Sequence, residues 1–154
     1  MSMKLKPFAA LVTLLASAAA FGSASAYADA ARAISATNAW VRWLPSNLPA
    51  AGYVTLTNSG DTPVDIVSTS SADYGSVMLH QSVSNGSTEQ MVMVTRATVP
   101  AHGQLAIAPG GYHFMLEKPT HQIAPGSTVH LKLQFSNGQT LDTPFSVKPP
   151  SQMQ

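Results

Sequence analysis

The sequence predicts an all-β protein, a single antiparallel β-sandwich, on three observations. Short runs that alternate apolar and polar residues, rich in Val, Thr, Leu and aromatics, recur along the chain after residue 37. Turn-forming residues separate these runs, and no segment after the amino-terminal apolar run keeps a helical period. Many short strands at regular spacing are typical of an antiparallel sandwich or barrel, and we predict the sandwich.

Each expected strand is bounded by turn chemistry. In chain order, the strands are residues 38–43, 52–58, 64–70, 76–83, 89–99, 105–108, 112–116, 128–135 and 140–148. The clearest turns between them are residues 58–61, 85–86, 109–111, 124–126 and 137–138. Two of these turns are Asn-Gly pairs, which favour the positive φ values of a tight hairpin.

The chain of 154 residues has room for one domain after an export signal. A basic start, an apolar run over 8–21 and small-residue sites ending at Ala26 and Ala28 are typical of a cleaved secretory signal. We therefore expect a signal peptide over 1–28, cleaved after Ala26 or Ala28. No Cys follows the apolar run, so no lipid anchor is expected, and no later stretch is long enough to span a bilayer.

The mature protein is then expected to be one β-sandwich domain over 29–148. Pro149 and Pro150 end the last strand, and a disordered tail is expected over 149–154. A protein with this signal would be periplasmic, without membrane insertion once the signal is removed.

Composition excludes several functions. The net charge is +1, so the chain has no basic footprint for nucleic acid and no polybasic membrane patch. It contains no Cys, which excludes a thiol nucleophile, a redox CxxC pair, a zinc–thiolate site and a blue-copper centre.

Strand register places His and Met together, because successive side chains of a strand point to opposite faces. In the segment 112–116, the aromatic residues and Leu make one apolar face, so His113 and Met115 share the other. In the strand before the Asn85-Gly86 turn, Val and Leu would take the core, which leaves Met78 and His80 outward.

The strand after that turn repeats the pattern. Its valines fit the core, so Met91 and Met93 point away from it. A single strand Met is usually a core residue. Here the core positions are already occupied by other apolar side chains, so an outward His/Met cluster is the better interpretation. Thioether sulfur is a soft ligand that suits Cu(I), whereas zinc, calcium and magnesium prefer thiolate, imidazole or oxygen.

The cluster resembles the signature of the PCuAC family of periplasmic copper chaperones. In that signature, a His is followed after ten residues by a Met and after twenty-one more by His-x-Met. His80, Met91, His113 and Met115 reproduce this spacing. Segments such as Ala39-Trp-Val-Arg42 and Pro109-Gly-Gly111 are also similar to the family.

The resemblance implies a cupredoxin-like, Greek-key sandwich with a shallow, solvent-accessible Cu(I) site at these four residues. It also implies delivery of copper to the copper A centre of cytochrome c oxidase subunit II, in company with Sco-type proteins. Met78 and Met93 could replace or supplement Met91, so the sulfur set stays open. The tail offers only Met153, and a single copper site is therefore expected.

Two other functions compete with the chaperone. A copper enzyme would need more His ligands, yet His130 is expected on the surface and His102 and His121 in loops. We therefore expect no enzyme. A metal-free binding module could use its aromatic residues, but Trp40 and Tyr53 are expected to pack in the core or under the site, and the outward His/Met cluster would then be left to chance.

Overall fold

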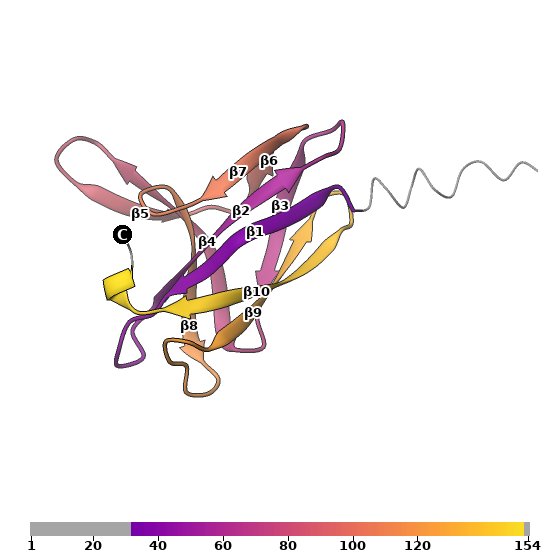
Figure 1. Ribbon diagram of the computed structural model, residues 1–154. Helices are drawn as coiled ribbons and strands as arrows, with labels where there is room; N and C mark the ends of the chain where they lie inside the picture. Colours follow the sequence, from indigo (N-terminus) through magenta and orange to yellow (C-terminus); the bar gives the residue numbers. More distant parts are fainter. Residues whose placement is uncertain (1–31, 153–154) are drawn as a thin grey trace, which may run out of the picture.

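The computed structural model describes residues 32–152. The expected signal peptide with its cleavage positions, and Met153 in the tail, lie outside these residues. Within them the chain is built of strands, which confirms the all-β prediction (Figure 1). The strands are β1 Ile34–Arg42, β2 Ala50–Asn58, β3 Val64–Ser70, β4 Tyr74–Ser84, β5 Glu89–Met93, β6 Ala97–Val99, β7 Gly103–Ile107, β8 Tyr112–Pro119, β9 Thr128–Phe135 and β10 Thr140–Lys148. Pro150–Gln152 follow as a turn of 3-10 helix, where a disordered tail was expected.

The strands form one continuous sheet that folds over on itself into an open sandwich (Figure 1). Its order is β5-β4-β8-β2-β1-β10-β9-β3-β6, and β7 pairs with β2 off this path. The pairs are antiparallel except β1 with β10, where Trp40 lies opposite Ser146 in a parallel register. The first and last strands of the described chain therefore lie side by side in the sheet.

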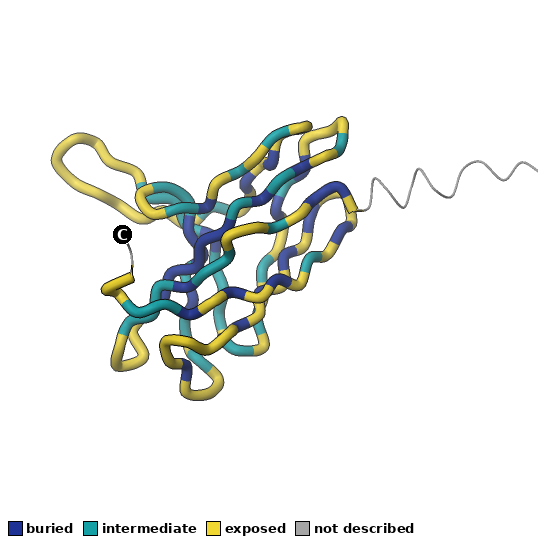
Figure 2. The backbone as a smooth tube through the Cα atoms, viewed as in Figure 1, coloured by how far each residue is buried: buried dark blue, intermediate teal, exposed yellow. Residues whose placement is uncertain are grey.

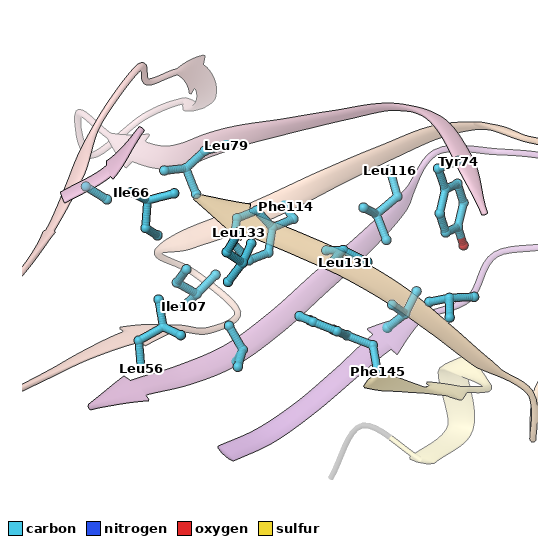
Figure 3. Close-up of a cluster of buried hydrophobic side chains, with 14 of the residues drawn as sticks. Leu56, Ile66, Tyr74, Leu79, Ile107, Phe114, Leu116, Leu131, Leu133 and Phe145 are labelled. Carbon is cyan, nitrogen blue, oxygen red and sulfur yellow. The ribbon is translucent and has the colours of Figure 1, made fainter. Parts of the chain in front are cut away.

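The core lies between the layers and follows the predicted alternation. β9 buries every second residue, as does β10 from Thr143 to Val147, and the largest fully buried side chains include Phe114, Phe145 and Leu131. Figure 3 shows these three side chains inside the sandwich. The rings of Phe114 and Phe145 meet edge to face with centroids 6.4 Å apart, a favourable aromatic geometry.

The expected strand 89–99 was wrong as a single element. It is two strands, because the backbone N–H of Val94 donates to the carbonyl of Leu79 and the chain then leaves the sheet edge. β5 stays beside β4, whereas β6 pairs with β3 at the other end of the sheet. The expected single strand 89–99 therefore contributes one strand to each end of the sheet.

The hairpin of β4 and β5 stands out from the body of the sandwich, and its outer half is exposed (Figure 2). All five residues of β5 are exposed, because no second layer covers this end of the sheet. The expectation that the valines of this strand are core residues is wrong for Val92, while Val94 just beyond the strand packs partly against the core. No helix among residues 32–152 is long and apolar enough to cross a membrane.

Candidate metal centre

The structure brings the predicted His and Met residues onto one face of three adjacent strands, β5, β4 and β8. His80 on β4 lies directly opposite His113 on β8 and opposite Met93 on β5. Residues directly opposite one another on paired strands share a face of the sheet. The two imidazole rings lie 5.7 Å apart between centroids, at an interplanar angle of 73°.

The other sulfur residues flank this pair on the same face. Met78 lies opposite Met115, two residues along β4 and β8 from the histidine pair. Met91 lies opposite Ser82, two residues along β5 in the other direction. Along the strands, the imidazoles therefore lie between the Met78–Met115 pair on one side and Met91 on the other. Met93 lies beside His80.

The core side of these strands agrees with the predicted register. Leu79 and Phe114 lie opposite one another and are buried, as is Leu116. Tyr112 and Val77 are only partly buried against the core. The alternation that places His113 and Met115 on the far face of β8 is therefore fixed by two fully buried neighbours.

A cavity of about 160 Å³ opens beside His113. Met91 lines the same cavity, so these two residues border a common space. The remaining lining residues are Arg42, Tyr53, Ser82, Glu89, Pro109 and Gly110. Met93 is closer to His80 by strand register, whereas Met91 shares the cavity of His113.

Each histidine carries a buried nitrogen without a hydrogen-bond partner. In His113 this atom is Nε2, and in His80 it is Nδ1. His113 Nδ1 lies 3.4 Å from the carbonyl oxygen of Gly111 and donates to it, which leaves the lone pair of Nε2 free. An unsatisfied buried nitrogen is costly, and coordination to a metal ion would remove that cost.

Access to the site is unequal. His113 is 5% exposed, whereas Met91 and Met93 are 60% and 65% exposed. The cavity walls formed by Tyr53 and the loop at Pro109 explain the burial of His113. The site is thus less open than expected, because His113 is buried although the Met side chains on the projecting hairpin are exposed.

The described residues hold no cluster of the side chains that usually bind a hard metal ion. No group of three or more His, Cys, Asp or Glu side chains within residues 32–152 comes together in a way that could hold a metal ion. Met side chains lie beside His80 and His113 on this face and offer sulfur as further donors. Such a donor set suits a soft ion.

Burial lowers the pKa of His113 from its ordinary value of 6.5, and the positive charges of His80 and Arg42 lower it further. The hydrogen bond to Gly111 acts in the opposite direction and does not cancel these effects. His113 is therefore neutral at neutral pH, and neutral imidazole is the form that binds metal.

The metal-free protein is expected to lose stability on acidification because of His113. Its folded pKa lies below its unfolded pKa, so the unfolded chain takes up a proton first as the pH falls. The contribution of His113 is complete above the ordinary pKa of 6.5 and is lost as the pH falls toward the lowered folded value. Urea midpoints measured from neutral pH to about pH 5 should fall more steeply in the wild type than in His113→Gln. Equal slopes in the two proteins would contradict this assignment.

The other histidines lie away from this cluster and pair with carboxylates on the surface. His102 Nε2 lies 2.6 Å from Asp61, and His130 Nδ1 lies 3.1 Å from Asp142. His121 lies 3.6 Å from Asp73. These side chains are exposed, as expected for His130 from its strand pattern.

The sequence-based prediction missed Arg42 and Glu89 as residues of the site. Tyr53, expected in the core or under the site, lines the cavity and packs against Trp40, with ring centroids 4.6 Å apart and an interplanar angle of 41°. Alternation within β1 places Trp40 and Arg42 on one face. Only the pairing of β1 with β2 and of β2 with β8 brings that face beside His113.

Comparisons with known proteins agree with this architecture. Residues 34–147 match the family model described as "LpqE-like: Putative lipoprotein LpqE-like". A protein of Leifsonia xyli subsp. xyli (strain CTCB07) named "Putative lipoprotein Lxx21020" is 29% identical over 116 residues, which cover 75% of this chain and 69% of that protein.

Two solved structures are similar in fold. The copper-bound PCuAC domain from PmoF2 superposes with a TM-score of 0.63 at 24% identity, over 77% of this chain and 94% of that one. The solution structure of CuI-DR1885 from Deinococcus radiodurans gives a TM-score of 0.58 at 33% identity, over 75% of this chain and 76% of that one. These matches confirm the cupredoxin-like sandwich and the resemblance to the PCuAC family. The chain has the fold of the PCuAC domains and belongs to the LpqE-like family.

Proposed function

We propose that this protein is a copper chaperone that binds one Cu(I) and passes it to another protein. One observation carries the proposal: His80 and His113 face each other across β4 and β8, each with a buried, unpartnered nitrogen, and Met side chains flank them on the same face. The names of the solved relatives, a copper-bound PCuAC domain and CuI-DR1885, support copper as the cargo.

The proposed ligands are His80, Met91, His113 and Met115. Both histidines offer imidazole nitrogen, and the thioethers offer soft sulfur, the donor type that Cu(I) prefers. Met91 is favoured over Met93 because it shares the cavity of His113. Met93 and Met78 remain possible additional ligands, since each lies opposite a proposed ligand on the neighbouring strand.

The ligand set suits a carrier more than an enzyme. Thioethers do not form disulfides, so they persist in an oxidising compartment where a Cys pair would be lost. The exposed sulfurs of the β4–β5 hairpin give an acceptor a route to the ion by stepwise ligand exchange. None of the matched names above is that of an enzyme, which supports the prediction that this chain has no catalytic activity.

The proposed location is the periplasm, reached through the signal peptide at 1–28. The proposed destination of the copper is the copper A centre of cytochrome c oxidase subunit II, with Sco-type proteins as companions. Both follow from the resemblance to the PCuAC family, and the lipoprotein names of the relatives are consistent with an exported protein.

Titration of the purified mature protein with Cu(I) under anaerobic conditions, against a chromophoric chelator, tests the proposal. We expect one Cu(I) per chain and transfer of that ion to a purified copper A domain of subunit II. Binding without transfer would mean that the protein stores copper or delivers it to a different acceptor. A protein that takes up no Cu(I) would contradict the proposal and favour a metal-free binding module.

A further inference from the structure

Arg42 on β1 faces the space beside the proposed copper ligands. It lines the cavity of His113 and Met91. Strand register explains this position, since Arg42 lies opposite Ala51 on β2 and Ala51 lies opposite Met115 on β8. Arg42 and Met115 therefore belong to one row of side chains on the same face, with only the small Ala51 between them.

The charge of Arg42 is not neutralised by an ion pair. Among residues 32–152, no carboxylate lies within ion-pairing distance of it, and its buried Nε atom has no hydrogen-bond partner. The guanidinium carbon lies 6.0 Å from the centre of the Tyr53 ring, a cation–π contact that holds the group beside the cavity. Glu89 lines the cavity too, but it is exposed on the hairpin, where solvent screens its charge.

We propose that Arg42 is a specificity-determining residue that makes the site favour monovalent over divalent copper. This inference rests on the proposed function. All four proposed ligands are neutral, so the bound ion keeps its full charge. Coulomb repulsion is proportional to the charge of the ion, and a fixed positive charge therefore opposes Cu(II) twice as strongly as Cu(I).

Arg42 and His113 line the same cavity, so the charge of Arg42 repels a metal ion held at the Nε2 atom of that ring. Arg42 needs no contact with the ion to have this effect.

Lys148 on β10 provides a matched control. It lies opposite Arg42 in the parallel pair of β1 and β10, and its Nζ lies 5.4 Å from the centre of the Trp40 ring. Like Arg42, it is a cation above an aromatic ring, but it does not line the cavity. Removing this charge should matter less, because the strand of Arg42 separates it from the copper ligands.

The test measures Cu(I) and Cu(II) affinities at one ionic strength in the wild type, Arg42→Gln, Arg42→Lys and Lys148→Gln. Arg42→Gln should tighten Cu(I) roughly threefold and Cu(II) roughly tenfold, the square of the first factor, because repulsion scales with ion charge. Arg42→Lys, which keeps the charge, should stay within about twofold of the wild type for both ions, and Lys148→Gln should shift both by less than Arg42→Gln.

The inference is overturned if Arg42→Gln changes the two affinities by equal factors or not at all. It is also overturned if Arg42→Lys matches Arg42→Gln, since packing against Tyr53 rather than charge would then be responsible. Failure of the proposed function looks different: the wild type would take up no Cu(I), or His113→Gln would bind Cu(I) as well as the wild type does.

Discussion

Replacing His113 by Gln is expected to weaken Cu(I) binding by at least about a hundredfold, since loss of a group that merely orients a ligand already costs about 10–100-fold. His113 supplies a buried Nε2 lone pair that nothing else in the described chain occupies. Gln has a similar size and stays polar, but its amide oxygen is a poor ligand for a soft ion. Competition with a Cu(I) chelator at neutral pH measures the loss.

His130→Gln is the control for this variant. His130 is an exposed strand histidine paired with Asp142, away from the Met cluster. The same substitution there should leave Cu(I) affinity unchanged within about twofold, because the group touches no proposed ligand. Equal weakening in both variants, or none in His113→Gln with the fold intact, would remove His113 from the site.

Truncating Phe114 to Ala is expected to destabilise the protein by about 3–5 kcal/mol, the usual cost of deleting a buried aromatic side chain. Phe114 is fully buried, packs edge to face on Phe145, and lies between two proposed ligands along β8. Its side chain fixes the face on which His113 and Met115 lie. Chemical denaturation of the metal-free variant measures the change in the free energy of unfolding.

Leu48→Ala is the comparison, since Leu48 is a large apolar residue that is 55% exposed. Its loss should cost less than about 0.5 kcal/mol, as for other surface substitutions. The folded fraction of Phe114→Ala should also bind Cu(I) more weakly than the wild type, because the strand loses the anchor that orients its ligands. A Phe114→Ala variant as stable as Leu48→Ala would contradict the assigned core.

Alternation within strands was sufficient to predict which His and Met side chains of β4 and β8 share a face of the sheet. Phe114 and Leu79 are buried as expected, which leaves His113 and His80 on the opposite face of the sheet. Alternation does not predict burial in β5, where Val92 is exposed, because an edge strand beyond the second layer has no core to face. Periodicity describes one strand and carries no information about what covers it.

Pairing between distant strands could not be predicted in the same way. The hairpin register that puts Met93 opposite His80 depends on a loop of residues 85–88 between paired Ser84 and Glu89. Gly86 in that loop has the positive φ that the Asn-Gly pair favours, at 91°. The loop is nevertheless longer than a two-residue turn, and a change in loop length changes which sulfur faces which imidazole.

Arg42 was missed for a related reason. Its place beside the site needs two antiparallel pairings, of β1 with β2 and of β2 with β8. The parallel contact of β1 with β10 is likewise set by the closing of the whole sheet. Such long-range contacts follow from the packing of all the strands together, and no local pattern in the sequence encodes them.

X-ray absorption of the Cu(I)-loaded protein identifies the atoms bound to the copper. We predict a mixed shell of imidazole nitrogen and thioether sulfur that loses one sulfur in Met91→Leu and keeps it in Met93→Leu and Met78→Leu. Loss of sulfur in Met93→Leu instead would identify Met93, rather than Met91, as the copper ligand from the hairpin. A copper shell without sulfur, or one that His113→Gln leaves unaltered, would contradict the claim that this face of β5, β4 and β8 holds the ion.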